Sequence, residues 1–291
     1  WDMLIYSKPQ RIFDIIHSFF FPQDIPARAA FFPDSDNKWA SMSAWLPVFG
    51  CTGVIAYFQS RKHNDWVRRL LVLLTIMVLI PGFNALFQLL NSMYYARWYY
   101  MFIIILVLAT MRSIQDDDDI QINWKRAFGW SIGISGALAL FVALAPQSWK
   151  PDEKTGKIIF GLYNREYPAL FWVAISIAAV SFVLAALLIA LHRRERDLFF
   201  RWSVGVNVAV IVIFGWYSIG VGKNQGRFTS SYITDRAIGS ADKMNLPDNG
   251  FSRVDFCNDL DNLGMFWQMP SIQAFHSIVP GSVMEFYSSV G

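Results

Sequence analysis

The stretch ALFWVAISIAAVSFVLAALLIAL, residues 169–191, is followed directly by His192-Arg193-Arg194-Glu195-Arg196. A helix needs about 20 consecutive, mostly apolar residues to cross the hydrocarbon core of a bilayer. This stretch is long enough, it contains no charged residue, and a dense group of arginines comes right after it. It therefore predicts a membrane-spanning helix that ends in a basic connection.

The same alternation of an apolar block and a charged connection runs through the middle of the chain. Of the 291 residues, 54% are hydrophobic and only 16% are charged, whereas about a quarter of a soluble domain is charged. A bundle of buried soluble helices would not confine its charges to the gaps, so we predict a mainly α, polytopic transmembrane helix bundle. The spans are Ala44–Gln59, Leu70–Leu90, Trp98–Met111, Ala127–Ala145, Ala169–Leu191 and Trp202–Val221. The first is the weakest, because it is short and contains Pro47.

The connections between these six spans differ in charge from one side to the other. Lys and Arg accumulate in short cytoplasmic connections of membrane proteins. Here they crowd the three connections at 61–69, 112–126 and 193–201, which we assign to the cytoplasm. Lysines in the connection at 147–167 weaken this asymmetry. The pattern predicts a multi-pass protein of the cell membrane with an extracytoplasmic C-terminus.

Three regions follow from this topology. Residues 1–43 form an extracytoplasmic or interfacial segment, in which the apolar run Ile12–Phe21 is too short to span and predicts a helix at the membrane interface. That run is broken only by Asp14, His17 and Ser18. The six-helix bundle occupies residues 44–222.

Residues 223–291 are polar enough to be aqueous. Phe251–Cys257 alternates between apolar and polar residues in the manner of a strand, and Met284–Ser289 predicts the start of a helix. We therefore predict that this region begins a mixed α/β extracytoplasmic domain. We also expect the chain to be a fragment that lacks N-terminal spans.

The four aspartates Asp116–Asp119 are the strongest charge run. Consecutive side chains do not all point at one ion, and no spaced ligand follows them, so we interpret the run as a solvated connection. The four histidines are scattered, and we predict no metal site and identify no cofactor. Because the basic residues do not form one stripe, we expect no nucleic-acid partner.

Polar and aromatic residues gather where the second span ends and the third begins. Pro81 and Gly82 loosen the second span. Asn84 lies about 21 Å from the cytoplasmic end of that span, at 1.5 Å per residue, and so still within the apolar slab. Arg97 opens the next span on the same side, and its guanidinium suits a pair of phosphate oxygens. We predict that Asn84 and Arg97 face one pocket, where rings such as Tyr95 stack on a sugar or hold a lipid chain.

Simpler interpretations of these residues stay open. Arg and Tyr at the end of a span commonly just anchor it at the membrane surface. Asn84 can equally tie two helices together.

Several motifs resemble the YfhO-type bacterial membrane proteins. The most specific is the run from Leu79 to Arg97, with its Pro-Gly-Phe-Asn-Ala-Leu-Phe, its Asn91 and its Tyr-Ala-Arg-Trp-Tyr-Tyr. Looser matches are Phe19–Ala27, the following Phe32-Pro33-Asp34 and Lys38-Trp39-Ala40-Ser41, and Gly250–Asp255, in which Ser252 replaces the family's usual Tyr.

This resemblance implies an integral membrane protein of the GT-C glycosyltransferase class. Such enzymes transfer a sugar from a polyprenyl-phosphate carrier to an acceptor outside the cytoplasm, and acceptors in related systems are cell-surface polymers. The implied partners are therefore membrane lipid, the carrier-linked sugar and the polymer. The resemblance also implies that the catalytic acid of the class lies upstream, so the catalytic residue stays unknown.

Within this resemblance, Arg97 would stabilise the leaving phosphate, with Asn84, Asn91 and Tyr95 around it. Arg253 would assist if the C-terminal region folds back onto the bundle.

Two other classes of function compete with the enzyme. One is a transporter or flippase of a lipid-linked or anionic solute, and the other is a non-catalytic scaffold for envelope assembly. Ion-coupled carriers place ionisable residues deep in their spans, whereas the polar residues here are mainly Asn84, Gln88 and Asn207. That disfavours a proton- or sodium-coupled carrier.

Overall fold

The computed structural model divides the chain into two units, Trp1–Gly222 and Lys223–Gly291. Most of the described part is helical, and it contains two isolated β-bridges but no strand. The described residues are 6, 8, 10–24, 31–35, 42–60, 64–88, 94, 96–146, 148–149, 151, 155–164, 168–225, 230–240, 243, 254, 262–271, 285 and 288–289.

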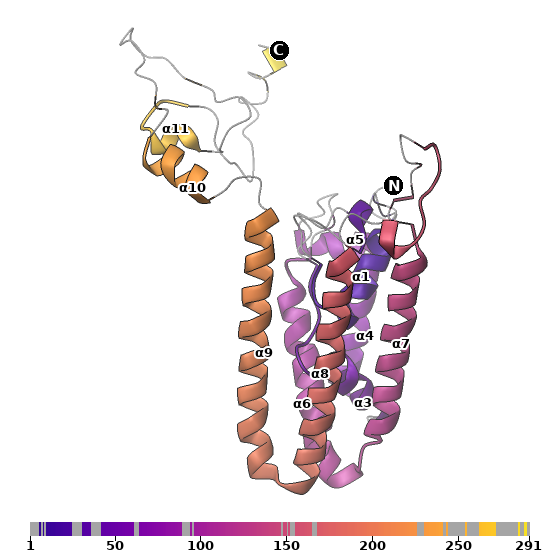
Figure 1. The fold of residues 1–291 in the computed structure, drawn as a ribbon. Helices are drawn as coiled ribbons and strands as arrows, with labels where there is room; N and C mark the ends of the chain where they lie inside the picture. Colours follow the sequence, from indigo (N-terminus) through magenta and orange to yellow (C-terminus); the bar gives the residue numbers. More distant parts are fainter. Residues whose placement is uncertain are drawn as a thin grey trace. The chain divides into compact units, whose positions relative to one another are not determined.

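Four long helices dominate the first unit (Figure 1). They are α6 (Tyr99–Ile120), α7 (Trp124–Leu144), α8 (Pro168–Arg194) and α9 (Arg196–Gln225). Each contains a window that is long and apolar enough to cross a membrane. Each overlaps one of the last four predicted spans, so those four helices of spanning length are confirmed. Short connections make α6 antiparallel to α7, and α8 antiparallel to α9.

The tight turn between α6 and α7 depends on two polar residues. Gln121 adopts the left-handed conformation, with φ of 52°, and this stops α6. Asn123 then caps α7, because its side-chain oxygen accepts the backbone N–H of Arg126 at 3.0 Å.

The first predicted span is not a continuous helix. Residues 42–51 contain no helix, and α3 (Thr52–Ser60) is only 9 residues long. Gly53 lets α3 approach α6 closely, since a Cβ built on it would lie 2.3 Å from Thr110 Cγ2.

The second predicted span is also broken. α4 (Trp66–Leu79) stops at Ile80, which is extended because a residue before proline avoids the helical region. α5 (Pro81–Ala85) and the 3-10 turn Leu86–Gln88 follow. The loosening predicted at Pro81 is therefore confirmed, but six continuous spans are not: four helices among the described residues reach spanning length.

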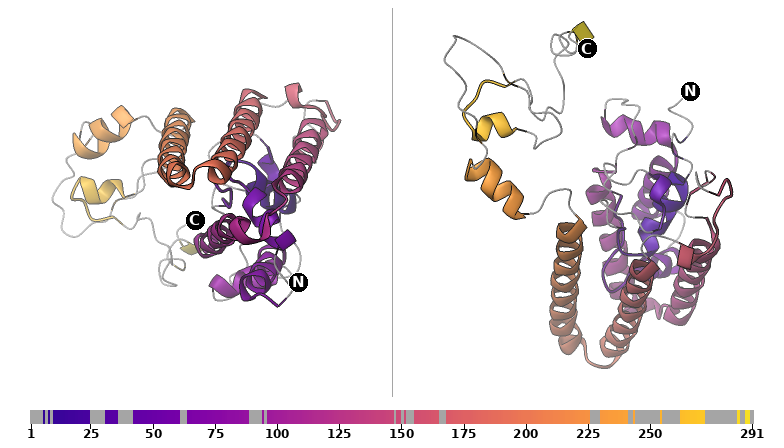
Figure 2. Two further views of the ribbon diagram at one scale, coloured as in Figure 1. Left: turned by 90° about the horizontal axis from the view of Figure 1, so that it is seen from below. Right: turned by 45° about the horizontal axis from the view of Figure 1, so that its top comes forward.

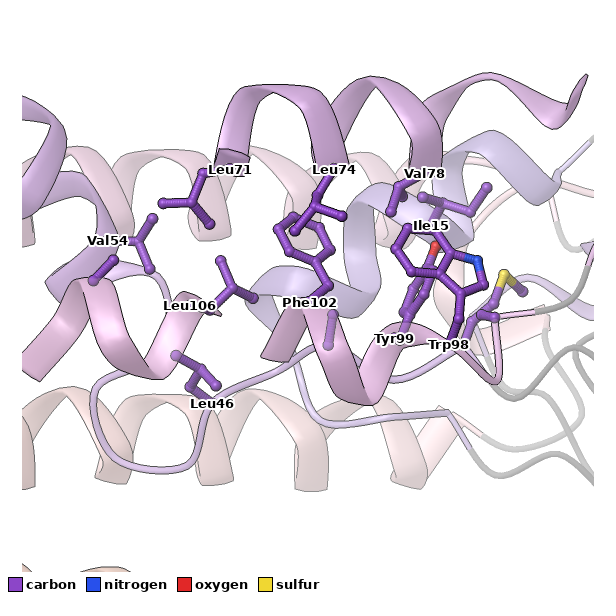
Figure 3. Close-up of a cluster of buried hydrophobic side chains, with 14 of the residues drawn as sticks. Ile15, Leu46, Val54, Leu71, Leu74, Val78, Trp98, Tyr99, Phe102 and Leu106 are labelled. Carbon is purple, nitrogen blue, oxygen red and sulfur yellow. The ribbon is translucent and has the colours of Figure 1, made fainter. Parts of the chain in front are cut away.

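The largest core cluster joins α4 and α6 to α1 (Arg11–Phe20), the short N-terminal helix. Figure 3 shows Leu74 and Phe102 lying between these helices, with Ile15 and Val78 beside Tyr99. All five are less than 9% exposed. Burial of an apolar side chain of this size contributes roughly 1.5–3 kcal/mol. The helix predicted over Ile12–Phe21 is present as α1, which contacts α4 and α7. Its place at the membrane interface stays a prediction.

α9 lies at the periphery of the first unit (Figures 1 and 2). None of its apolar window is buried, and Ile213, Trp216 and Ile219 are 69–82% exposed. It touches its neighbours through a few rings, such as Phe199 on His192 and Phe214 on Trp45. An apolar helix with most of its surface exposed is expected in lipid.

The second unit holds short helices: α10 (Ser230–Ile233), a π-helical turn (Thr234–Ile238) and α11 (Leu263–Phe266). Its small core consists of Ala237, Leu263 and Trp267. Val254 forms a parallel bridge with Ser271. Because the rest of Phe251–Cys257 lies outside the described residues, the predicted strand and the α/β domain are not confirmed.

Candidate functional site

A group of buried polar side chains surrounds α1, and we call it the α1 polar cluster. Burying polar groups is unfavourable unless they are hydrogen-bonded, so such a group is unusual on a helix of 10 residues. Each member is 5% exposed or less. The members are Gln10, Arg11, Asp14, His17, Ser18, Asp24 and Ser35.

Hydrogen bonds tie the 3-10 turn Pro33–Ser35 to α1. Arg11 Nε donates to the carbonyl oxygen of Ser35 at 2.9 Å, and Ser35 Oγ donates to Asp14 Oδ2 at 2.7 Å. Gln10 accepts the backbone N–H of Asp34 at 3.0 Å. These bonds hold an arginine and a carboxylate in fixed positions on one side of α1.

Asp14 is the member whose charge is most perturbed. Burial raises its pKa to about 7, and the negative charge of Asp24 acts in the same direction. Ser35 and Arg11 oppose the rise without cancelling it. A carboxyl group with this pKa can take up or release a proton near neutral pH, which is a common property of functional groups.

Asp24 reaches a narrow cavity between the N-terminal segment, α8 and α9. Its Oδ2 accepts the backbone N–H of Phe31 at 2.8 Å. The other walls include Ala174 and Ile177 of α8 and Tyr217 of α9. The volume is about 20 Å³, which is room for about one water molecule. Asp24 therefore brings a carboxylate to the boundary between two helices of spanning length.

The segment that precedes α6 packs onto the α1 polar cluster through Tyr94. The Arg11 guanidinium lies 5.6 Å from the centre of the Tyr94 ring. The Tyr94 hydroxyl donates to the carbonyl oxygen of Val78 at 2.8 Å and lies 2.6 Å from the Tyr99 hydroxyl. The Tyr6 hydroxyl also donates to the carbonyl oxygen of Leu79. The fold thus joins the N-terminal segment to the 79–97 motif.

The structure describes only two of the predicted site residues, Asn84 and Arg97, and places them in different surroundings. Asn84 is fully buried, whereas Arg97 is exposed in the turn before α6. Neither residue lines the cavity beside Asp24 or the one beside Arg193, so a shared pocket for this pair stays a prediction. Asn91, Tyr95 and Arg253 lie outside the described residues.

A family model for the bacterial membrane protein YfhO matches residues 17–291, nearly the whole chain. The chain belongs to the YfhO family. The resemblance expected from the motifs is therefore confirmed. Searches of curated proteins and of solved structures return no significant match.

Sequence reasoning about this YfhO-family chain missed the acids of the α1 polar cluster as site residues. Asp14 was visible as a charge inside an apolar run, and Asp24 lies within the Phe19–Ala27 motif. Neither position reveals the partner, because Ser35 and Phe31 come from later in the chain. A charged residue at a helical position that should be apolar was the available signal.

The aspartate run at the other end of α6 is not a solvated connection throughout. Asp116 and Asp117 are only 8% and 6% exposed, whereas Asp119 is exposed. The run continues α6, so the helix turns Asp117 toward α8, where Arg193 binds it. Among the described residues, no group of three or more His, Cys, Asp or Glu is placed to hold a metal ion.

Proposed function

We propose that this YfhO-family protein transfers a sugar from a polyprenyl-phosphate carrier to a cell-surface polymer on the outer face of the membrane. The observation that supports this most is the α1 polar cluster, which packs against the 79–97 motif through Tyr94. In this proposal α3 and α4, each with the segments beside it, form two further membrane spans, which together with α6 to α9 make six. Residues 223–291 begin an extracytoplasmic C-terminal domain.

Glycosyl transfer needs a base that accepts the proton of the acceptor hydroxyl. We assign this role to the pair of acids in the α1 polar cluster. Asp24 lines the cavity between α8 and α9, and Asp14 is close enough that the charge of Asp24 raises its pKa. The pair thus combines an acid beside a cavity that has room for about one water molecule with an acid whose pKa is about 7.

The reaction also needs positive charge beside the leaving phosphate. Arg97 is exposed just before α6, three residues after the Tyr94 that contacts Arg11. A guanidinium at this place can bind two phosphate oxygens at once. Asn84, Asn91, Tyr95 and Arg253 are assigned supporting contacts to the phosphate and the sugar.

The test replaces Arg97 in the intact protein and measures transfer from a polyprenyl-phosphate sugar to the surface polymer. Because Arg97→Ala removes a group that stabilises developing charge, we expect kcat to fall about 100-fold. Arg97→Lys should retain part of the activity, because lysine keeps the positive charge but cannot bind two phosphate oxygens at once as a guanidinium does. Lys157→Ala, which removes an exposed cation on the same predicted side, is the matched control.

Asp14→Asn and Asp24→Asn test the assignment of the base. We expect Asp24→Asn to lower kcat as strongly as Arg97→Ala does. Unchanged sugar on the polymer in all three variants, at normal expression, would favour the scaffold. Lost carrier movement across the membrane, with transfer in detergent intact, would favour the flippase.

A further inference from the structure

A larger cavity lies at the opposite end of the long helices, where α6 ends, α7 begins and α8 ends. Its volume is about 670 Å³, which is within the range of small-molecule binding sites. It lies among the basic connections and is separate from the α1 polar cluster. Polar and aromatic side chains form much of its wall: Gln121, Asn123, Trp124, Lys125, His192 and Arg193.

The charge balance of this lining favours an anion. Arg193 donates from Nε and Nη2 to the two oxygens of Asp117 at 2.9 and 2.8 Å, so these two charges neutralise each other. Nη2 also donates to the carbonyl oxygen of Ile122 at 2.8 Å, which fixes the guanidinium. Lys125 adds a further positive charge to the wall, in the first turn of the 21-residue helix α7. The helix dipole places additional positive potential at that turn.

A strip of glycines on α7 runs from Lys125 toward the middle of the span, with the exposed side chain of Ile132 on the same side of the helix. Gly129, Gly133 and Gly136 follow Lys125 at steps of four, four and three residues, which places all four on one helix face. A Cβ built on any of these glycines would meet nothing within 4 Å. Glycine weakens a helix. In the described part of the chain, no neighbouring atom lies close enough to these three positions to require a residue without a side chain. The strip therefore leaves room for an acyl chain beside α7.

We propose that this cavity and strip bind one anionic phospholipid, with its phosphate beside Lys125 and an acyl chain along the glycines. The group that the cavity would bind is a phosphate, and both a lipid headgroup and a free phosphate ester carry one. The strip favours the lipid, because it lies on a helix whose length and composition suit the hydrocarbon core. Basic cavities between transmembrane helices are typical sites for anionic headgroups.

The test uses the intact protein in detergent, titrated with phosphatidylglycerol or phosphatidylcholine and analysed by native mass spectrometry. We expect preferential binding of phosphatidylglycerol. Because Lys125→Gln removes one charge beside the phosphate, it should weaken that binding about fivefold. Arg126→Gln removes the same charge from the next residue, which is exposed and does not line the cavity, and should leave binding unchanged.

A second variant separates the acyl chain from the headgroup. Gly133→Leu fills the strip without changing any charge, so phosphatidylglycerol binding should fall. Soluble glycerol 3-phosphate should displace the lipid far less effectively than phosphatidylglycerol does.

Four results would overturn the proposal. They are equal losses in Lys125→Gln and Arg126→Gln, no preference for phosphatidylglycerol, full displacement by glycerol 3-phosphate, and a Gly133→Leu variant that changes oligomeric state but not lipid binding. The first indicates diffuse surface charge, the third a site for free phosphate, and the fourth a protein partner.

Discussion

The two ends of the long helices bury their acids in opposite ways. At the end with the basic connections, both oxygens of the Asp117 carboxylate accept hydrogen bonds from Arg193. At the other end, Asp14 accepts a hydrogen bond from the neutral hydroxyl of Ser35, and a second acid lies nearby. One carboxylate is matched by a full opposite charge, whereas the other has a pKa near 7.

This difference separates a structural acid from a reactive one. A bidentate Arg–carboxylate pair ties helix ends together and keeps the carboxylate ionised. A buried acid that lacks such a match holds a proton until the pH approaches neutrality, and is suited to proton transfer. The small exposed fraction, which is similar for Asp14 and Asp117, does not by itself separate the two roles, because Asp117 lines an open cavity whereas Asp14 lies within the α1 polar cluster.

The largest effect at a single pH is expected from removing the arginine of the structural pair. Arg193→Ala takes both hydrogen bonds from the Asp117 carboxylate. Because the Arg193 side chain is 50% exposed, water screens the pair, and the expected loss of stability is roughly 2–3 kcal/mol, below that of a fully buried pair. Thermal unfolding in detergent measures the change. Arg194→Ala is the control, because Arg194 is 84% exposed and meets Glu195 only at 3.9 Å. Equal stability of the two variants would show that the Arg193–Asp117 pair does not stabilise the protein, and would contradict the assignment of Asp117 as a structural acid.

The next effect is a pH dependence at the α1 polar cluster. The pKa of Asp14 is raised from 3.8 to about 7. Between these values the folded protein keeps a proton that the unfolded chain has released, so stability should fall as the pH rises from 4 to 7. The upper limit is roughly 4 kcal/mol, because each pKa unit corresponds to about 1.4 kcal/mol.

Asp14→Asn should flatten this decline in thermal unfolding scans taken from pH 4 to 8. Asp197→Asn, a change at an exposed acid, should keep it. A decline of the same size in Asp14→Asn and in the parent protein would assign it to other groups.

The smallest effect concerns a second acid at the basic end. Asp65 caps α4 by accepting the backbone N–H groups of Val67 and Arg68 at 3.0 and 3.3 Å. Burial would raise its pKa, but the Tyr57 hydroxyl, these N–H groups and Arg112 together hold it below the ordinary value. Asp65→Ala should therefore destabilise the protein by about 1 kcal/mol at pH 7.

The pH dependence of this cap has the opposite sign to that of Asp14. Its stability is present above the ordinary pKa near 4 and is lost as the pH falls through the lowered value. Unfolding scans of Asp65→Ala and the parent protein should thus begin to approach each other as the pH falls below about 4, the ordinary Asp pKa, and should converge only below the lowered pKa of Asp65. A difference that does not shrink as the pH is lowered below 4 would show that the cap does not act through the charge.

Local features of the sequence were sufficient to predict the four long helices and the break between α4 and α5. Spanning length and apolar composition are properties of consecutive residues, so α6 to α9 are readable without a fold. Pro81 acts on its own neighbourhood, which is why the end of α4 at Leu79 follows from it. Family membership also followed from short motifs, since their order along the chain carries the resemblance.

The setting of each buried acid depended on residues that are distant in the sequence. Asp117 looked solvated as part of a charge run, and only the meeting of the C-terminal ends of α6 and α8 gives it Arg193 as a partner. Asp14 looked like an interruption of an apolar run, and only the return of the chain at Ser35 gives it a hydroxyl. Hydrophobic length is additive along the chain, whereas the pKa and pairing of a buried charge depend on the groups that folding brings within a few ångströms of it.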